Sequence, residues 1–139
     1  MTSLKQRDAA CSCGQLRIRL SGEPRVVSSC HCLACQRRTG ALFGSGAFFA
    51  RDQIVLCEGE SRTYTRVADS GASLTFRFCP TCGSTVFWEN ERLADTVGVA
   101  VGAFADPSFP RPVRTVWTVT KHEWLSLPQD ISHHAKSPP

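Results

Sequence analysis

Short stretches in which apolar and polar residues alternate run through most of the chain and predict β-strands. Residues 15–20 place Leu16, Ile18 and Leu20 on one face, which is the period of two expected of a strand with one buried side. Other short stretches rich in β-branched or aromatic residues predict strands at 47–50, 54–57, 73–78, 85–88, 96–101 and 113–120. Clusters of Gly, Pro, Asp and Asn separate these stretches, as turns require.

One short helix is predicted at residues 33–38, just ahead of Gly40. Glycine suits the left-handed conformation that commonly follows a helix. The rest of the pattern predicts an all-β domain of curved antiparallel sheets. We expect residues 1–10 to form an N-terminal arm, residues 11–127 a single domain, and the polar, proline-bounded residues 128–139 a loose tail.

Composition narrows the class of protein. Of the 139 residues, 42% are hydrophobic and 20% charged, and no apolar run approaches the roughly 18 residues of a membrane helix. The first ten residues lack the apolar stretch of a secretory signal, so we expect a cytoplasmic protein with reduced thiols and no membrane partner. The net charge of +4 comes from scattered basic residues, mostly arginines, rather than one basic run, which disfavours nucleic acid as a partner.

Seven of the eight cysteines fall into three tight groups, and two of these groups have the same form. Cys11-Ser12-Cys13-Gly14 and Cys79-Pro80-Thr81-Cys82-Gly83 each place two cysteines ahead of a glycine. Zinc prefers four ligands in a tetrahedron, and a turn with two cysteines brings two sulfurs to one ion. We therefore predict one structural zinc bound by both groups, which closes a loop of about 65 residues.

The middle group, Cys30-His31-Cys32-Leu33-Ala34-Cys35, offers three sulfurs within six residues. Three protein ligands and one open position are typical of a catalytic zinc, whereas a fourth protein ligand makes a site structural. Cys57 and His31 are candidates for that fourth ligand. We favour other roles for both: Cys57 as a small buried side chain in a strand, and His31, which should point away from the metal, as a packing residue or a partner of the ligands.

Other interpretations of the cysteines stay open. Four disulfides would require an oxidising compartment, and a thioredoxin-like pair at Cys79 and Cys82 would require a βαβ setting that this strand-rich stretch lacks. A thiol-redox enzyme would use Cys32 or Cys57 as a nucleophile without metal. A zinc-stabilised module that binds protein or nucleic acid without turnover would have an inert fourth ligand at the middle group, or an exposed basic or apolar face.

The motifs together resemble the glutathione-dependent formaldehyde-activating enzyme family, which also includes centromere protein V. The resemblance rests on residues 11–14, 30–41, 78–84 and 101–107 and on Trp124, and order and spacing agree from about residue 11 to 127. It implies an all-β, Mss4-like (β-tent) fold with two zinc ions. By position it assigns Cys11, Cys13, Cys79 and Cys82 to a structural zinc, and Cys30, Cys32 and Cys35 to a second, catalytic zinc. The chain lacks the longer insertions of the namesake enzyme.

The function that the resemblance implies is a zinc-dependent carbon–sulfur lyase, which joins or cleaves a thiol such as glutathione and a small aldehyde such as formaldehyde. Metal coordination lowers the pKa of a thiol, and a thiolate is a nucleophile toward an aldehyde carbon. Arg37 and Arg38 are candidates to pair with the carboxylates of a tripeptide thiol, although cations at a helix end also complement its dipole. Phe43, Phe48 and Phe49 are candidates for a pocket wall or for the core.

Overall fold

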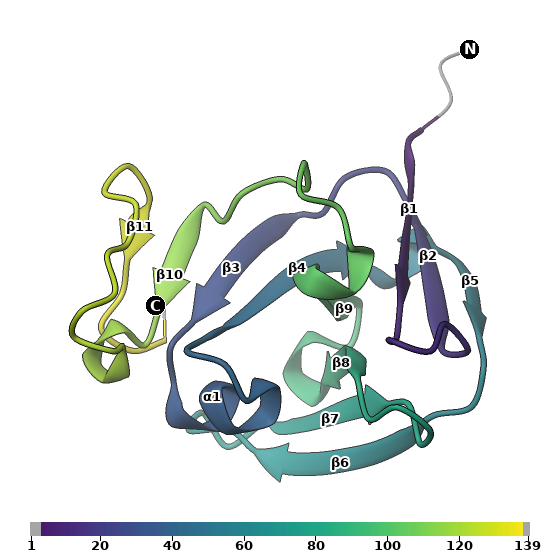
Figure 1. The fold of residues 1–139 in the computed structure, drawn as a ribbon, viewed down its shortest axis with the longest axis horizontal. Helices are drawn as coiled ribbons and strands as arrows, with labels where there is room; N and C mark the ends of the chain where they lie inside the picture. Colours follow the sequence, from purple (N-terminus) through teal and green to yellow (C-terminus); the bar gives the residue numbers. More distant parts are fainter. Residues whose placement is uncertain (1–3, 138–139) are drawn as a thin grey trace.

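The computed structural model describes residues 4–137, which form two β-sheets and one short α-helix (Figure 1). The smaller sheet has the order β1-β2-β5, and the larger has the order β11-β10-β3-β4-β9-β8-β7-β6. The strands are β1 (Gln6–Ala10), β2 (Arg17–Ser21), β3 (Val26–Cys30), β4 (Gly44–Ala50), β5 (Ile54–Glu58), β6 (Arg62–Val67), β7 (Ser73–Phe78), β8 (Thr85–Asn90), β9 (Thr96–Ala100), β10 (Arg114–Val116) and β11 (Ser132–His133). The α-helix is α1 (Leu33–Thr39), and the 3-10 helices are η1 (Arg51–Gln53), η2 (Glu91–Leu93), η3 (Val101–Phe104) and η4 (Thr118–Thr120).

The prediction of an all-β fold with one short helix is confirmed. Strand β7 coincides with its predicted range, and α1 is followed by Gly40 in the left-handed region with φ of 66°. The predicted strand at 113–120 is cut short, because the chain leaves the sheet at Trp117, which has φ of 58°, and continues as η4. Most pairings are antiparallel, but β10 pairs in parallel with both β3 and β11.

The larger sheet has one face in the core and one face away from it, because successive side chains of a strand point to opposite sides. On β3 and β4, Val27, Ala47 and Phe49 belong to the buried apolar core, together with side chains of β1 and β2. Their neighbours Ser28 and Phe48 point to the opposite face. The curved sheet therefore separates packing residues from the residues of the pocket described below.

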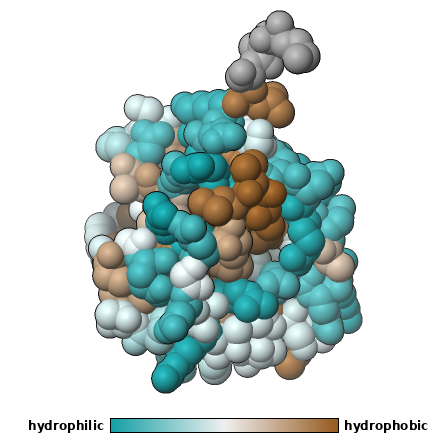
Figure 2. Space-filling view, turned by 90° about the vertical axis from the view of Figure 1, so that its right-hand side faces the viewer, coloured by the Kyte–Doolittle hydropathy of each residue, from teal (hydrophilic) through white to brown (hydrophobic). Residues whose placement is uncertain are grey.

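The smaller sheet covers the core with one face and meets solvent with the other. Ile18 and Leu20 are 1% and 0% exposed, whereas the alternate residue Arg17 is exposed and pairs with Glu58. On the side of the molecule that carries this sheet, the surface is mostly hydrophilic around one apolar patch (Figure 2). On β5, Val55 is an exposed large apolar side chain, 52% accessible.

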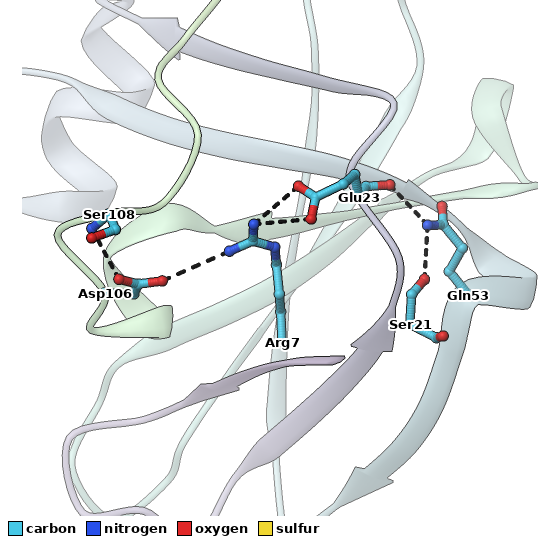
Figure 3. A network of polar contacts seen from close by, with 6 residues as sticks. All are labelled: Arg7, Ser21, Glu23, Gln53, Asp106 and Ser108. Carbon is cyan, nitrogen blue, oxygen red and sulfur yellow. Dashed lines mark hydrogen bonds and ion pairs between the residues drawn. The ribbon is translucent and has the colours of Figure 1, made fainter. Parts of the chain in front are cut away.

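A buried arginine connects β1 to two loops (Figure 3). Arg7 is 8% exposed, and its guanidinium donates to both carboxylate oxygens of Glu23 at 3.0 Å. It also lies 3.7 Å from Asp106, which in turn accepts a hydrogen bond of 2.9 Å from the backbone of Ser108. The arginine stacks on Phe109, 4.7 Å from the ring centroid. These contacts fix the loop that follows η3 against the smaller sheet.

The two end segments, expected as an arm and a loose tail, pair with the sheets where the structure describes them. Residues 6–10 form β1, which is antiparallel to β2. In the tail, His134 donates a backbone hydrogen bond of 2.9 Å to Thr115, and Trp117 donates one of 3.3 Å to Lys136. The free edge of β10 explains this arrangement, because its backbone groups need partners. No helix within residues 4–137 is long and apolar enough to cross a membrane.

Candidate metal centres and the adjoining pocket

Four cysteines from two distant turns come together as the spacing predicts. Cys11 and Cys13 follow β1, while Cys79 and Cys82 lie in the turn between β7 and β8. All four sulfurs lie within 4.8 Å of one another, with Sγ–Sγ distances of 3.6 Å from Cys11 to Cys13 and 3.7 Å from Cys13 to Cys79. A tetrahedral zinc with Zn–S bonds of 2.3 Å separates neighbouring sulfurs by about 3.8 Å. The donor set and its spacing therefore fit zinc.

Hydrogen bonds to this cluster favour the thiolate at Cys82, whereas the neighbouring sulfurs, Cys11 first among those that raise it, keep the pKa of Cys13 up at about 11. The backbone amides of Leu16 and Thr81 donate to the sulfurs of Cys11 and Cys79, each at 3.3 Å, and the side-chain amide of Gln15 donates to Cys79 at 2.9 Å. Contacts with the side chain and then the backbone of Ser84 hold the pKa of Cys82 down to about 5. Hydrogen bonds to the charged form lower a thiol pKa in this way and prepare the sulfur to bind a cation.

The second cluster lies where β3 passes into α1. Cys30 ends β3, Cys32 is the residue that caps α1, and Cys35 lies in the first turn of the helix. Their three sulfurs lie within 4.8 Å of one another, and within residues 4–137 no fourth Cys, His, Asp or Glu joins them at that range. Three sulfur donors at this spacing also fit zinc, and they leave one tetrahedral position for another ligand.

Because the three sulfurs lie so close together, their pKa values differ. Contacts with Cys30 and then Cys35 hold the pKa of Cys32 down to about 2, and the backbone amide of Cys35 donates to its sulfur at 3.3 Å. The same crowding raises the pKa of Cys30, first through Cys32 and then through Cys35. Cys32 therefore carries a negative charge more readily than Cys30, and a bound cation would favour the thiolate form of all three sulfurs.

The structure places the two candidate fourth ligands away from the second cluster. His31 is fully buried, with its Nε2 3.0 Å from the hydroxyl of Thr115 and its ring 5.1 Å from that of Phe43, so it packs behind the cysteines as expected. The expectation that Cys57 is buried is wrong, because this cysteine is exposed. On β5, Cys57 lies opposite the buried Ile18 of β2, but β5 is the edge strand of the smaller sheet and the thiol stays exposed there.

A pocket of about 450 Å³ opens beside the second cluster, and Cys30, Cys32 and Cys35 are part of its wall. It lies on the face of the larger sheet that points away from the core. This volume is within the range of small-molecule sites, and the lining combines apolar and aromatic side chains with a few charged groups, as such sites do. The charged residues of the wall are three arginines and one acid, Asp69.

The two arginines that follow the cysteines have different positions. Arg38 lines the pocket with its guanidinium 4.9 Å from the Trp88 ring and 5.2 Å from the Phe76 ring, and its buried Nε has no hydrogen-bond partner within residues 4–137. Arg37 is exposed and lies outside the pocket wall. Of the three phenylalanines, Phe48 lines the pocket, whereas Phe49 is in the core.

Several pocket residues escaped the sequence analysis because they come from strands far from the cysteines. Arg66 on β6, Trp88 on β8 and Arg114 on β10 all line the wall. Glycines make room for the tryptophan: a Cβ on Gly46 would lie 2.9 Å from the Trp88 ring, and one on Gly98 would lie 2.3 Å from its Nε1. The alternation of glycine with apolar residues in β4 and β9 is the sequence signal that marks this face.

The fold and the two clusters define a small all-β, Mss4-like domain with two candidate zinc centres. The chain matches the glutathione-dependent formaldehyde-activating enzyme family over residues 6–120 and belongs to that family. No curated protein matches it. A crystal structure of a Rhodobacter sphaeroides protein is similar in fold, with a TM-score of 0.54 and 20% sequence identity over 69% of this chain and 85% of the other.

Proposed function

We propose that this chain is a zinc-dependent carbon–sulfur lyase that joins or cleaves a thiol, such as glutathione, and a small aldehyde, such as formaldehyde. The observation that carries the proposal is the three-sulfur cluster in the wall of a pocket of about 450 Å³, where no fourth protein donor is close within residues 4–137. Cys30, Cys32 and Cys35 would hold the catalytic zinc. Cys11, Cys13, Cys79 and Cys82 would hold a structural zinc. Membership of the family supports both assignments.

Zinc at the three-cysteine site would supply a position for the thiol substrate and lower the pKa of that thiol. In the forward reaction the thiol loses its proton, its sulfur bonds to the aldehyde carbon, and the carbonyl oxygen takes up a proton. The reverse reaction breaks the same carbon–sulfur bond and returns the thiol and the aldehyde. The chain's own contribution is to hold the thiol substrate and keep the aldehyde beside it.

Arg38 is the residue best placed to orient the substrate. Its guanidinium rests on the rings of Trp88 and Phe76, and these contacts fix it without using up its hydrogen-bond donors. An arginine held in this way can bind a carboxylate through two parallel hydrogen bonds. Because Arg37 is exposed outside the pocket wall, we assign the carboxylate contact to Arg38 and none to Arg37.

Exchange NMR with glutathione and carbon-13-labelled formaldehyde tests the proposal, because it measures the rate of adduct formation and breakdown at equilibrium. The zinc-loaded protein should accelerate both directions above the spontaneous rate, Cys32→Ser should abolish the acceleration, and Arg37→Gln should leave it unchanged. A zinc-loaded protein that binds glutathione without any acceleration would instead support a zinc-stabilised binding module.

A further inference from the structure

The strand register places an arginine on the same sheet face as the second cysteine cluster. In the parallel pair of β10 and β3, Arg114 lies opposite Ser28, and Val116 lies opposite Cys30. All four residues line the pocket. Positions two residues apart on a strand share a face and lie about 6.6 Å apart along it. The Arg114–Ser28 pair therefore lies about 6.6 Å along the strands from the Val116–Cys30 pair, on the sheet face that lines the pocket.

Arg114 has no protein counter-ion in the described structure. Its buried Nε has no hydrogen-bond partner, and no carboxylate lies within 4.0 Å of its guanidinium, in either case counting residues 4–137. Arg111, three residues earlier, differs in both respects, since it is exposed and binds Asp130 through two hydrogen bonds of 2.8 and 3.1 Å. A half-buried cation without a partner is costly, and an anion in the pocket would offset that cost.

We propose that Arg114, with Ser28 beside it, is an anion subsite that binds a carboxylate of the thiol substrate. The inference rests on the proposed function only for the thiol part of the ligand. The two residue pairs lie about 6.6 Å apart along the strands, so the subsite would suit a thiol with a carboxylate several bonds from its sulfur, as in a short peptide. Arg114 would then select such thiols over small neutral ones. Arg38 would take a second carboxylate or the same one from the other side of the pocket.

Calorimetry on the zinc-loaded protein tests the subsite with three probes. Glutathione has both the thiol and the carboxylates, S-methylglutathione has only the carboxylates free, and 2-mercaptoethanol has only the thiol. Arg114→Gln should weaken binding of the first two about tenfold, which corresponds to about 1.4 kcal/mol, and should leave 2-mercaptoethanol within twofold. Arg114→Lys should fall between, because lysine keeps the charge but loses the planar fork. Arg111→Gln is the matched control and should change none of the three.

Two outcomes would overturn the subsite. One is unchanged glutathione binding in Arg114→Gln at an unchanged melting temperature. The other is an equal loss for glutathione and 2-mercaptoethanol, which would mean that Arg114 only balances the charge of the cysteine cluster. The proposed function fails separately: if S-methylglutathione binding depends on Arg114 while formaldehyde exchange is not accelerated, the anion subsite stands and the lyase activity does not.

Discussion

Trp88 packs on the bare backbone of Gly98, its register partner on β9, so closely that a Cβ at position 98 would lie 2.3 Å from the indole nitrogen. The other neighbours of the indole include Arg38, whose guanidinium lies 4.9 Å from the ring. Because Gly98 has no side chain, Trp88 can pack against its backbone, and Trp88 in turn positions Arg38. A backbone feature in the middle of the sheet determines where a pocket cation lies.

Gly98→Ala should therefore damage both the fold and the pocket. Forcing a methyl group into a packed contact typically costs about 1–3 kcal/mol, and the displaced Trp88 would carry Arg38 with it. Urea unfolding and glutathione calorimetry would measure the two effects. Gly102→Ala is the control, because a Cβ there meets no atom within 4 Å and both properties should be retained. If Gly98→Ala were as stable as the parent protein, the close packing of Trp88 on Gly98 would be contradicted.

The two cysteine clusters should differ in what their loss does to the fold. The four-cysteine cluster joins the turn after β1 to the turn between β7 and β8, so Cys82→Ser should remove most of the folding free energy along with its zinc. The three-cysteine cluster spans only residues 30–35, so Cys32→Ser should lose one zinc and keep the fold. Melting temperatures with zinc content on the same samples would decide, and equal melting temperatures in the two variants would contradict the assignment.

Cys57 allows a direct test of the thiol-redox alternative. It is exposed, belongs to neither cluster, and its pKa is raised by partial burial of the thiol, so it should react with iodoacetamide slowly. In the zinc-loaded protein the clustered sulfurs should be protected, and mass spectrometry should show modification at Cys57 with activity retained. A Cys57→Ala variant should show no modification. Loss of activity on alkylation at full zinc occupancy would favour a metal-free nucleophile.

Glu89 predicts a pH-dependent contribution to stability. Burial by itself would raise the pKa of this carboxyl, but hydrogen bonds and charges from Arg77 at 2.8 Å and then Arg51 at 3.2 Å hold it below its ordinary value. A carboxyl with a lowered folded-state pKa stabilises the fold above its unfolded-state pKa, near 4.5, and loses this contribution as the pH falls through the folded-state value.

Glu89→Gln should consequently be less stable than the parent by about 1–2 kcal/mol near pH 7, because two arginines lose their charged acceptor. Unfolding curves of both proteins at each pH should converge as the pH drops below about 4.5. Comparing the two proteins at the same pH cancels any effect of metal release, since both carry the same cysteines. A difference that stayed constant down to pH 3 would show that the carboxylate charge contributes nothing.

The cysteine clusters could be predicted because each is built from short motifs. The spacing of Cys30, Cys32 and Cys35 fixes their approach within one strand end and one helix turn, and the two glycine-ended pairs have one obvious partner each. Seven strands could be predicted from alternation or from their β-branched and aromatic residues. Strands β1, β3, β6 and β11 were not predicted. In β1 the five residues, QRDAA, are largely polar, so little of an apolar pattern shows.

The pocket could not be predicted, because it depends on how distant strands are ordered. Nothing near Arg114 in the sequence indicates that β10 pairs in parallel with β3 and so places this arginine beside Ser28. Which of Arg37 and Arg38 faces the pocket depends on how the helix is rotated against the sheet, since adjacent helix residues point about 100° apart and only one can face the pocket. The expected burial of Cys57 was wrong for a related reason: β5 is the edge strand of its sheet, so even a position opposite the buried Ile18 remains exposed.

The alternation along β4 also limits how this domain can change over time. Ala47 and Phe49 belong to the core, while Gly46 and Phe48 line the pocket, so the pocket can change by point substitution on one set while the other stays fixed. A single inserted residue within the strand would exchange the two sets, turning Ala47 and Phe49 toward the cavity and Gly46 and Phe48 toward the interior. Length variation among relatives should therefore be confined to the connections between strands, and new specificities should arise without it.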